Sequence, residues 1–511
     1  MKKNGFVSLV GAGPGDPGLL TVKARQKLEE ADLVIYDYLV NPEHLRHTKR
    51  SCESLCVGKG FRHKKMSQER INERIIMEAR RGKKVVRLKG GDPYLFGRGG
   101  EEALFLQKNK ISFDVVPGVT SASACASYAG IPLTHREHNA SVTFLTGHRA
   151  ASEGLDSIDW ASIASMPGTL VIYMGFYNLA IICRRLIESG MRPDMPAAVI
   201  EWGTLPRQIV CEGVVEDIAE RVRLKKMKPP CLIVIGDVVK LRAELNWFEK
   251  LPLFGKRALV TRTQERASSL SSGLAALGAL VTELPTIEIR PPKSWSGLDA
   301  AIQELKETDW LIFASVYGVE AFFGRFLEKH KKDARTLAGI KVACVGPETA
   351  KALRNYGIVP DLIPKDHESR AIPQALLKKE RTLRGKDALL VRADIAPKEL
   401  EAALRRLGMK VRAVTGYRTL SPALSPRMRR ELLAEPPDYL TFTSASTAKN
   451  LSRMLGLGAF KRLASRCVVA SIGPVTTKTL RTLGVRVHCQ AKEYHVAGLL
   501  NAIESYAGRK K

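Results

Sequence analysis

The sequence predicts an α/β protein built from several domains. Short apolar runs that fit buried strands alternate with helical stretches along most of its 511 residues. Glycine-rich loops directly follow two of these runs, and loops at the carboxyl ends of parallel strands commonly bind ligands. Beyond residue 257, short motifs recur at a nearly constant spacing. We therefore expect an α/β half with ligand-binding loops, followed by a half made of two similar lobes.

The N-terminal half contains the first group of expected strands. Each is a short run rich in Val, Ile and Leu, which suits the interior of a sheet. The expected strands are 7–10, 33–36, 85–88, 113–116, 169–174, 197–201 and 231–235. A helix is expected to begin near Leu19, after the first glycine loop.

The most informative loop follows the basic-flanked strand at 84–87 and contains Gly90 and Gly91. Glycine there costs conformational entropy and adds nothing to a core. We therefore expect the backbone of this loop to lie close to a ligand.

The first glycine loop fits a dinucleotide fingerprint poorly. Gly11 and Gly13 match G-x-G-x-x-G, but the third glycine comes early, at Gly15, and Asp16 takes its place. Pro14 removes an amide that a pyrophosphate would use. We therefore do not expect the protein to use NAD.

The composition limits the classes of partner. Lys and Arg exceed Asp and Glu by 29, which implies an anionic partner or a cationic surface. The basic residues are spread along the chain, aromatic residues make up 6%, and no nucleic-acid recognition motif is found. A small polyanionic substrate fits at least as well as nucleic acid.

The cysteines and the apolar runs bear on the compartment. The nine cysteines are scattered and show no zinc-binding pattern, so we expect reduced thiols and no metal. We see neither a signal peptide nor a run long enough to span a membrane. These observations favour a cytoplasmic protein without membrane contact.

A domain boundary is expected near 246–255, where the motif density drops before a new strand at 257–262. We expect domains at 1–246 and 254–508. In the second, Ser315 and Ser444 end similar strands 129 residues apart, and Gly346 and Gly473 begin similar Gly-Pro loops 127 residues apart. Two lobes of this kind would form a cleft, which is a common place for a ligand.

Several motifs together carry a family resemblance. They are 10–17, 36–40, 57–59, 87–93, 96–102, 116–121, 130–136, 146–148 and 173–175. With them, residues 1 to about 246 closely resemble uroporphyrinogen-III C-methyltransferases, which implies a two-domain tetrapyrrole-methylase-like fold. Residues 254 to about 506 resemble uroporphyrinogen-III synthase, through the paired Ser-containing strands and Gly-Pro loops. The synthase makes the substrate of the methyltransferase, so finding both in one chain strengthens each.

The methyltransferase resemblance assigns a proton acceptor and a proton donor. Asp37 closes an apolar strand and would be the acceptor, and Lys59, after the next strand, would be the donor. The alternatives are a helix or turn cap for Asp37 and a substrate-carboxylate anchor for Lys59. S-adenosylmethionine is the implied cofactor, and most of the catalysis can come from its alignment with a pyrrole carbon.

The same resemblance implies two sets of binding residues. The expected cofactor-binding residues are Pro14, Gly90, Gly91, Asp92, Leu95, Thr120, Ser121, Met174 and Gly203. The expected substrate-binding residues are Arg98, His135 and Arg136. Arginine binds carboxylates in a bidentate manner. Met174 could instead be a core residue, and His135 a structural histidine.

The synthase resemblance implies few catalytic residues, because hydroxymethylbilane nearly closes unaided. Tyr417 would assist departure of the hydroxyl as a hydrogen-bond donor, with a half-buried core tyrosine as the alternative. Hydroxyls and loop amides of the repeated loops would bind substrate carboxylates. The residues concerned are Ser315, Thr349, Ser444 and Thr476. The family exchanges strands between lobes, so the linear repeat need not match the folded lobes.

The leading hypothesis is a bifunctional enzyme that makes precorrin-2 from hydroxymethylbilane, on the way to sirohaem or cobalamin. A rival is a methyltransferase fused to a non-catalytic two-lobed tetrapyrrole sensor. A nucleic-acid-binding protein and a nicotinamide oxidoreductase are further rivals. The methyltransferase family usually dimerises, so a homodimer through the N-terminal half is expected.

Overall fold

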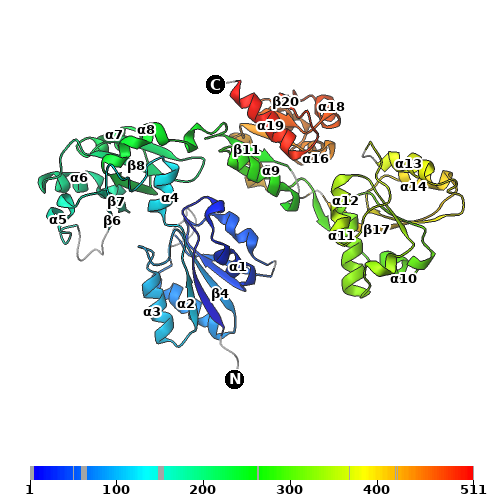
Figure 1. Ribbon diagram of the computed structural model, residues 1–511, viewed down its shortest axis with the longest axis horizontal. Coiled ribbons are helices and arrows are strands. Elements are labelled where there is room, and N and C mark those ends of the chain that lie inside the picture. Colours follow the sequence, from blue (N-terminus) through cyan, green and yellow to red (C-terminus); the bar gives the residue numbers. More distant parts are fainter. Residues whose placement is uncertain are drawn as a thin grey trace. The chain divides into compact units, whose positions relative to one another are not determined.

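The computed structural model describes residues 5–49, 51–58, 66–147, 155–261, 264–366, 369–420, 422 and 424–509. The chain divides into two compact units. The first comprises residues 1–258 with 271–282 and 503–511, and the second comprises 259–270 with 283–502. Figure 1 labels many of their helices and strands.

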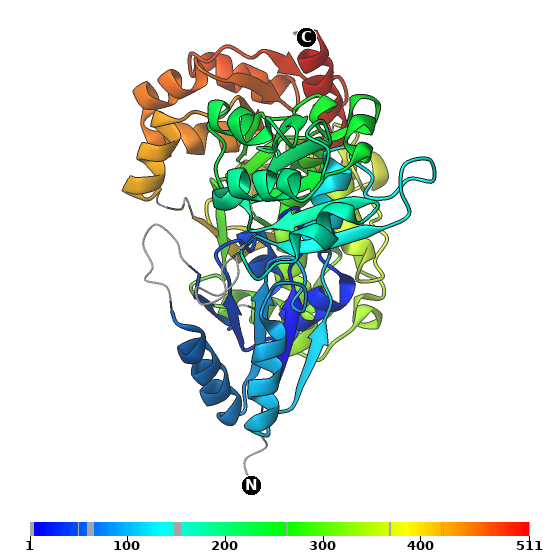
Figure 2. The ribbon, with the colours of Figure 1, turned by 90° about the vertical axis from the view of Figure 1, so that its left-hand side faces the viewer.

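The first unit begins with a five-stranded parallel sheet, whose strands run from dark blue to cyan in Figure 2. Its strand order is β3-β2-β4-β1-β5, so the chain crosses over between strands that are not neighbours along the sequence. The strands are β1 (Phe6–Gly11), β2 (Leu33–Tyr36), β3 (Glu53–Cys56), β4 (Lys84–Lys89) and β5 (Phe113–Val116). The central strands are nearly all buried, as a doubly covered parallel sheet requires.

Three helices cover the two faces of this sheet. α1 (Val22–Glu30) packs on one face, and α2 (Gln68–Arg80) and α3 (Gly99–Lys108) pack on the other. Successive residues of β1 point to opposite faces: Leu9 joins the core with α2 and α3, and Val10 joins the core with α1.

A second five-stranded sheet in the same unit is mixed, with order β6-β7-β10-β8-β9. β6 and β7 are parallel and the other neighbours are antiparallel. The strands are β6 (Val142–Thr146), β7 (Thr169–Tyr173), β8 (Pro196–Glu201), β9 (Ile209–Val214) and β10 (Cys231–Ile235). Its helices are α4 (Ser121–Tyr128), α5 (Trp160–Ser165), α6 (Leu179–Glu188), α7 (Ile218–Leu224) and α8 (Arg242–Leu245).

Helix α4 links the two domains of the first unit. The chain enters it from β5 of the first sheet, yet Ala122, Cys125 and Ala126 pack into a core with β7, β8 and β10 of the second sheet. The loop before α4 is therefore held between the two sheets. The two-domain α/β fold expected from the sequence is confirmed.

The C-terminal part of the chain contains two further five-stranded sheets, with orders β12-β11-β18-β19-β20 and β13-β17-β16-β14-β15. The strands of the first are β11 (Arg257–Val260), β12 (Leu280–Glu283), β18 (Tyr439–Phe442), β19 (Val468–Ser471) and β20 (Cys489–Gln490). Those of the second are β13 (Glu288–Arg290), β14 (Trp310–Phe313), β15 (Lys341–Cys344), β16 (Asp387–Ala393) and β17 (Lys410–Leu420).

The sequence repeat is exchanged between these sheets. By their spacing, β11, β12, β14 and β15 correspond to β16, β17, β18 and β19. The first sheet combines β11 and β12 of one copy with β18 and β19 of the other, and the second sheet combines the remaining strands. Both sheets thereby acquire the same order of equivalent strands. The exchange that the resemblance implied is present.

Helices complete each lobe. α10 (Ser296–Gln303), α11 (Val316–Gly324) and α12 (Pro347–Arg354) share one core with the second sheet, and α13 (Ile372–Lys379) and α14 (Glu399–Arg406) share another. The remaining helices are α9 (Gln264–Ala276), α15 (Pro426–Ala434), α16 (Ala445–Leu455), α17 (Leu457–Ala464), α18 (Pro474–Thr482) and α19 (Val496–Gly508). Among the described residues, no helix is long and apolar enough to cross a membrane.

Candidate functional site

The two glycine loops of the first unit pair with each other. Gly91 donates its N–H to the Gly13 carbonyl at 2.8 Å, and Gly13 donates to Gly91 at 3.3 Å. Both glycines have positive φ, +76° at Gly13 and +66° at Gly91, which other residues rarely adopt. The loops after β1 and β4 therefore form one continuous backbone surface at the carboxyl end of the sheet.

Backbone packing requires some of the glycines in this surface and not others. A Cβ on Gly118 would lie 2.3 Å from the Gly91 carbonyl oxygen, and one on Gly11 would lie 2.5 Å from Gly118, so both are required by backbone packing. A Cβ on Gly90 would meet only the Leu39 Cβ, at 3.7 Å. Packing against the described residues therefore does not explain Gly90, and its predicted role beside a ligand stays a prediction.

Asp92 connects this surface to the next loop. One carboxylate oxygen accepts from the Tyr94 N–H at 2.8 Å, and the other accepts from the Gly118 N–H at 3.0 Å. Asp92 therefore has a structural role in shaping the predicted cofactor site.

The loop before α4 is tied to the second sheet by Tyr173, at the end of β7. The Tyr173 hydroxyl lies 2.6 Å from Thr120 Oγ1 and accepts from the Ala122 N–H at 3.1 Å. The Tyr173 ring also lies 5.0 Å from the Phe96 ring, in the loop after β4. Tyr173 thus joins three segments that carry predicted cofactor residues. They are the loop after β4, the loop before α4 with Thr120 and Ser121, and the end of β7, where Met174 follows.

The other predicted cofactor residues have varied surroundings. Met174 is half exposed with φ +55°, so it is not a core residue. A Cβ on Gly203 would lie 2.5 Å from Cys125 Sγ, which explains that glycine by packing. Pro14 and Leu95 are half-buried in the two glycine loops.

Asp37, the predicted base, follows β2 and contacts a buried arginine. Arg87 Nη2 donates to Asp37 Oδ1 at 2.6 Å, and the Arg87 side chain is 2% exposed while that of Asp37 is 33% exposed. A charge-assisted bond of this kind fixes the carboxylate. Asp37 does not cap a helix in the structure; its carboxylate is held by an ion pair.

Arg87 belongs to a buried charge cluster that sequence reasoning missed. Glu102 Oε1 accepts from Arg87 Nε at 3.1 Å, from Lys89 Nζ at 3.1 Å and from Gln68 Nε2 at 2.8 Å. Burial, reinforced by the neighbouring Arg87, lowers the pKa of Lys89. The available signal was the spacing of Arg87 and Lys89, which places two cations on one face of a buried strand.

Lys59 lies outside the described residues. The last described residue before it, Gly58, packs tightly on Tyr38: a Cβ there would lie 2.3 Å from the Tyr38 N. Tyr38 directly follows Asp37, so β3 ends next to the predicted base. The role of Lys59 stays a prediction.

The three predicted substrate-binding residues lie in exposed or half-buried turns. Arg98 forms a two-point ion pair with Glu101, at 2.9 and 2.6 Å, and this contact lowers the pKa of Glu101. The contacts of His135 lie within its own turn, where its backbone pairs with Asn139 and its Nδ1 accepts from Glu137. Arg136 is exposed. Their binding roles remain predictions.

In the second unit, Tyr417 and Ser315 meet at the carboxyl ends of the strands. The Tyr417 hydroxyl lies 2.8 Å from Ser315 Oγ, which also caps α11 by accepting from the Gly318 N–H at 3.1 Å. Tyr417 is 9% exposed and its ring lies 5.6 Å from that of Tyr317. The structure thus brings together two of the residues singled out in this half.

The remaining hydroxyl residues differ in exposure. Ser444 caps α16, and its half-buried Oγ lies 2.8 Å from Ser446 Oγ. Thr349 in α12 and Thr476 in α18 are each 3% exposed. Their side chains are therefore part of the lobe interiors, and the adjacent helix N-termini offer the better groups for an anion.

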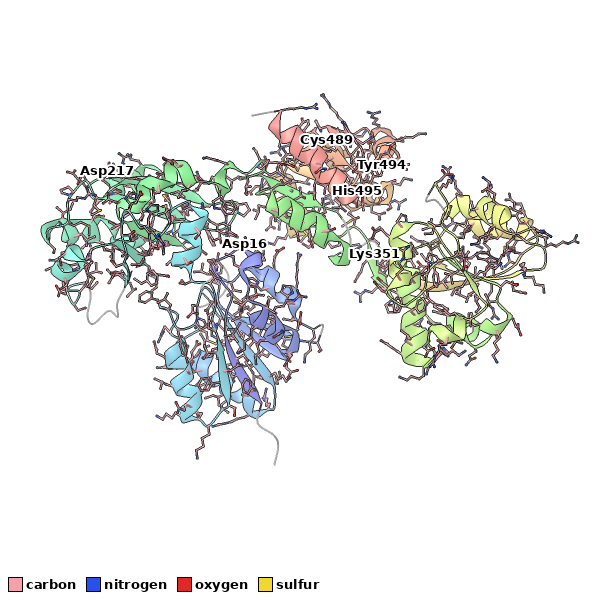
Figure 3. All side chains as sticks on the ribbon, in the orientation of Figure 1. Asp16, Asp217, Lys351, Cys489, Tyr494 and His495 are labelled. Atoms are coloured by element: carbon pink, nitrogen blue, oxygen red, sulfur yellow. The ribbon has the colours of Figure 1, made fainter. Side chains whose placement is uncertain are left out.

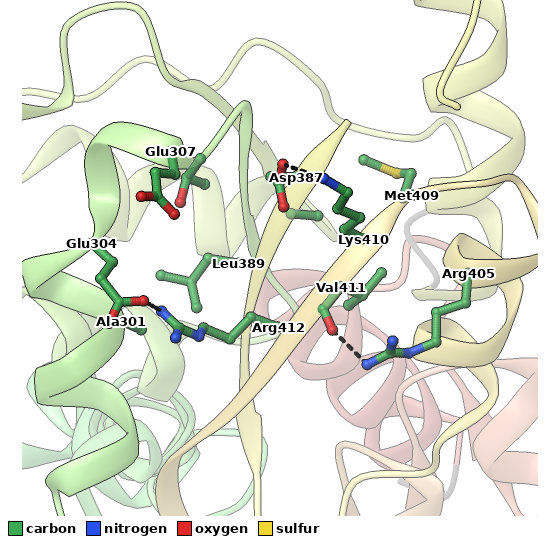
Figure 4. A pocket seen from close by; sticks show the side chains of 12 residues that line it. Ala301, Glu304, Glu307, Asp387, Leu389, Arg405, Met409, Lys410, Val411 and Arg412 are labelled. Carbon is green, nitrogen blue, oxygen red and sulfur yellow. Dashed lines mark hydrogen bonds and ion pairs between the residues drawn. The ribbon is translucent and has the colours of Figure 1, made fainter. Parts of the chain in front are cut away.

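A pocket in the second unit lies away from this pair (Figure 4). It is lined by the first residues of β16 and β17, whereas Tyr417 lies toward the other end of β17. Four of its charged residues pair within the lining, Arg412 with Glu304 at 2.5 Å and Lys410 with Asp387 at 4.0 Å. We therefore do not assign it to the substrate. The described part of the chain contains no cluster of His, Cys, Asp or Glu suited to a metal ion.

Two family models match the chain and together define its class. Residues 7–219 match the tetrapyrrole (corrin/porphyrin) methylases, and residues 268–501 match uroporphyrinogen-III synthase HemD. Asp37 and the two glycine loops lie within the first match, and Tyr417 and Ser315 lie within the second.

Similar proteins share both halves. The porphyrin biosynthesis protein HemD of Ruminiclostridium josui is 39% identical over 448 residues, which cover 88% of each chain. The uroporphyrinogen-III C-methyltransferase of Bacillus subtilis is 38% identical over 372 residues, covering 72% of this chain and 75% of that one. The chain belongs to the family of uroporphyrinogen-III C-methyltransferases fused to uroporphyrinogen-III synthase. A solved uroporphyrin-III C-methyltransferase of Thermus thermophilus, complexed with S-adenosylhomocysteine, is 39% identical with a TM-score of 0.41; the match covers 46% of this chain and all of that one.

Proposed function

We propose that the chain catalyses two consecutive steps of tetrapyrrole synthesis. The C-terminal half closes hydroxymethylbilane to uroporphyrinogen III, and the N-terminal half methylates that product twice to precorrin-2. The observation that carries the proposal is the presence, in a chain of this family, of a fixed carboxylate at Asp37 on the sheet whose glycine loops pair at Gly13 and Gly91.

S-adenosylmethionine fits the glycine loops of the first unit. The space beside Gly90, where a Cβ would meet a single atom, suits a ligand lying against backbone. We assign its binding to the loops containing Pro14, Gly90, Gly91, Leu95 and Asp92, with Thr120, Ser121, Met174 and the turn at Gly203. When bound, the cofactor supplies an electrophilic methyl group.

Asp37 is the base that we assign to the methylation. Methylation of a pyrrole carbon must be followed by loss of a proton, and Arg87 occupies Asp37 Oδ1, so Oδ2 is the oxygen that we expect to accept it. The guanidinium limits rotation of the carboxylate and so keeps Oδ2 in one place. We further propose Lys59 as proton donor, and Arg98, His135 and Arg136 as ligands of the substrate carboxylates.

In the synthase half, Tyr417 is the hydrogen-bond donor that we assign to the departing hydroxyl. A hydrogen bond is sufficient for this role, because ring closure needs assistance more than strong acid catalysis. Ser315 holds the phenol in place at 2.8 Å. The N-terminal N–H groups of α11, α12, α16 and α18 follow Ser315, Gly346, Ser444 and Gly473, and we propose that they bind the acidic side chains of the substrate.

Product analysis tests the two assignments separately. The full chain is given uroporphyrinogen III with S-adenosylmethionine, or hydroxymethylbilane without it. The expected products are the dimethylated compound in the first case and the type III isomer in the second. Failure of either reaction alone rejects the corresponding half of the proposal.

We propose that the halves are separate domains of a cytoplasmic homodimer joined through the methyltransferase. The nine cysteines are free, which suits a reducing compartment. The sequence places the domain limits at 246 and 254, but Phe248 and Leu253 are buried and Phe248 packs on Tyr128 of α4. We therefore propose that the methyltransferase extends to about 254. Sedimentation at several concentrations tests the dimer.

A further inference from the structure

The segment after β10 makes contacts that neither reaction uses directly. Residues 242–249, here called the arm, lie between the ranges matched by the two family models. The arm begins with α8 and includes Trp247, Phe248 and Glu249. It ends just before the chain enters the C-terminal half, so its sequence alone does not show which half it serves.

The arm is hydrogen-bonded to the C-terminal end of α4. Arg242, which is 6% exposed, donates to the Ala129 carbonyl at 2.5 Å, and Trp247 Nε1 donates to the Ser127 carbonyl at 3.1 Å. A Cβ on Gly130 would lie 2.6 Å from the Asn246 N, so the two backbones are in close contact. Arg242 is further fixed by Glu212 and Glu249, each at 2.8 Å.

One line of contacts runs from the arm through Tyr128 to the first glycine loop. The Tyr128 ring lies 5.2 Å from the Trp247 ring and 4.8 Å from the Phe248 ring, both edge-on. Its hydroxyl donates to Asp16 Oδ2 at 2.6 Å. Burial and the bond to Asp16 raise the pKa of Tyr128, so it remains a donor at every physiological pH.

A second line reaches the same residue through polar side chains. Glu249 accepts from Gln208 Nε2 at 3.0 Å, and Gln208 Oε1 accepts from the Thr204 N–H at 3.0 Å. Thr204 Oγ1 in turn accepts from the Asp16 N–H at 3.1 Å. Thr204 is 2% exposed and has φ +71°, a costly conformation for a β-branched residue that these contacts hold in place.

Both lines converge on Asp16, labelled in Figure 3, whose Oδ1 also accepts from the Gly18 N–H at 2.7 Å. Asp16 directly follows the glycine loop that pairs with Gly91. We propose that the arm positions this loop, through Tyr128 and Thr204, and thereby sets the affinity of the methyltransferase for S-adenosylmethionine. This inference rests on the proposed function of the N-terminal half. Tyr128, Thr204 and Asp16 are positioning residues.

Titration of the full chain with S-adenosylhomocysteine tests this inference. Tyr128→Phe removes a hydrogen bond to a charged group, so we expect the affinity to fall about tenfold. We expect KM for S-adenosylmethionine to rise by a similar factor while kcat at saturation stays near wild type, because the reacting groups are untouched. Phe248→Ala should have an effect that is not additive with Tyr128→Phe, since both act on one line of contacts.

Three variants make the result specific. Asp16→Asn keeps an oxygen acceptor for Tyr128 and should bind more tightly than Asp16→Ala. Tyr494→Phe removes an exposed hydroxyl in the other half and should bind like wild type. If the wild-type chain does not bind S-adenosylhomocysteine, the proposed function fails. If it binds but Tyr128→Phe binds equally well, or loses affinity only in proportion to its unfolded fraction, the arm has no positioning role.

Discussion

The predicted base of the N-terminal half is held by a guanidinium that is 2% exposed, whereas the predicted donor of the C-terminal half, Tyr417, is paired with the neutral hydroxyl of Ser315. Behind Asp37 lies a buried cluster of three charged groups, Arg87, Glu102 and Lys89. The proposed base is therefore fixed by a charged group, whereas the proposed donor is fixed by a neutral one.

This difference matches the difficulty of the two proposed reactions. Removing a proton after carbon methylation requires a base in a defined place and charge state, which a buried ion pair provides. Ring closure of a reactive linear substrate mainly requires that it be folded correctly, for which hydroxyls and helix N-termini are sufficient. Substitutions at Asp37 should accordingly cost much more than substitutions at Tyr417.

Asp37→Asn should cause the largest loss. We expect methylation to fall by about 10²–10⁴-fold, the usual contribution of a general base, while S-adenosylhomocysteine still binds. A methylation assay beside isothermal titration measures the two effects. Asp32→Asn is the control, because Asp32 pairs with Lys49 near the surface at the start of β2. Full activity of Asp37→Asn would show that the carboxylate is only structural.

Gly91→Val should affect binding more than chemistry. A valine at φ +66° is strained, and its bulk would occupy the surface assigned to the cofactor, so we expect an affinity loss of roughly tenfold or more. Gly190→Val is the matched control, because Gly190 also has a positive φ, +99°, but lies after α6. The control should lose stability and keep its affinity. Equal affinity losses in both variants would attribute the effect to backbone strain alone.

Tyr417→Phe should have a smaller effect, because it removes one hydroxyl and little volume. We expect ring closure to slow by about tenfold, a typical effect of one lost hydrogen bond, with near-normal stability and more type I isomer. Tyr356→Phe, in the same lobe and stacked on Phe323 at 4.4 Å, should close the ring normally. Unchanged kinetics in Tyr417→Phe would leave Tyr417 as a core residue.

His44 should affect stability and not activity. Burial, with a smaller contribution from His47, lowers the pKa of His44 to about 4 from its usual 6.5. The unfolded chain therefore takes up a proton that the folded chain does not, and stability should fall as pH drops from about 6.5 to 4, by up to about 3 kcal/mol. His44→Gln should flatten the pH dependence of the first unfolding transition in calorimetry. An unchanged slope would show that His44 titrates normally.

Contiguous motifs made much of the first half predictable. The glycine loops, the strands around them and the segments that meet there all follow from local sequence, and the structure brings Gly91, Thr120 and Met174 into loops that contact one another or Tyr173. The charge cluster was not predicted, because it depends on how α3 docks against β4. Charged residues inside a strand look like an exposed face until that packing is known.

For the second half, the sequence predicts the two similar lobes but not which strands pair within them. The spacing of β14 and β18 shows that two similar lobes exist. It does not show that β11 pairs with β18, because equivalent strands of the two copies offer equally good partners. The arm posed a similar problem: it lies at the expected domain limit, and only its contacts with α4 reveal which half it serves.

The most direct test of the central claim follows the full chain from hydroxymethylbilane, with and without S-adenosylmethionine. Hydroxymethylbilane closes spontaneously to the type I isomer, so the products are separated by chromatography and their isomers identified. The account predicts type III uroporphyrinogen without the cofactor and precorrin-2 with it. If the chain methylates supplied uroporphyrinogen III but yields only the type I isomer from hydroxymethylbilane, the C-terminal half is not a synthase and the claim of two consecutive activities is wrong.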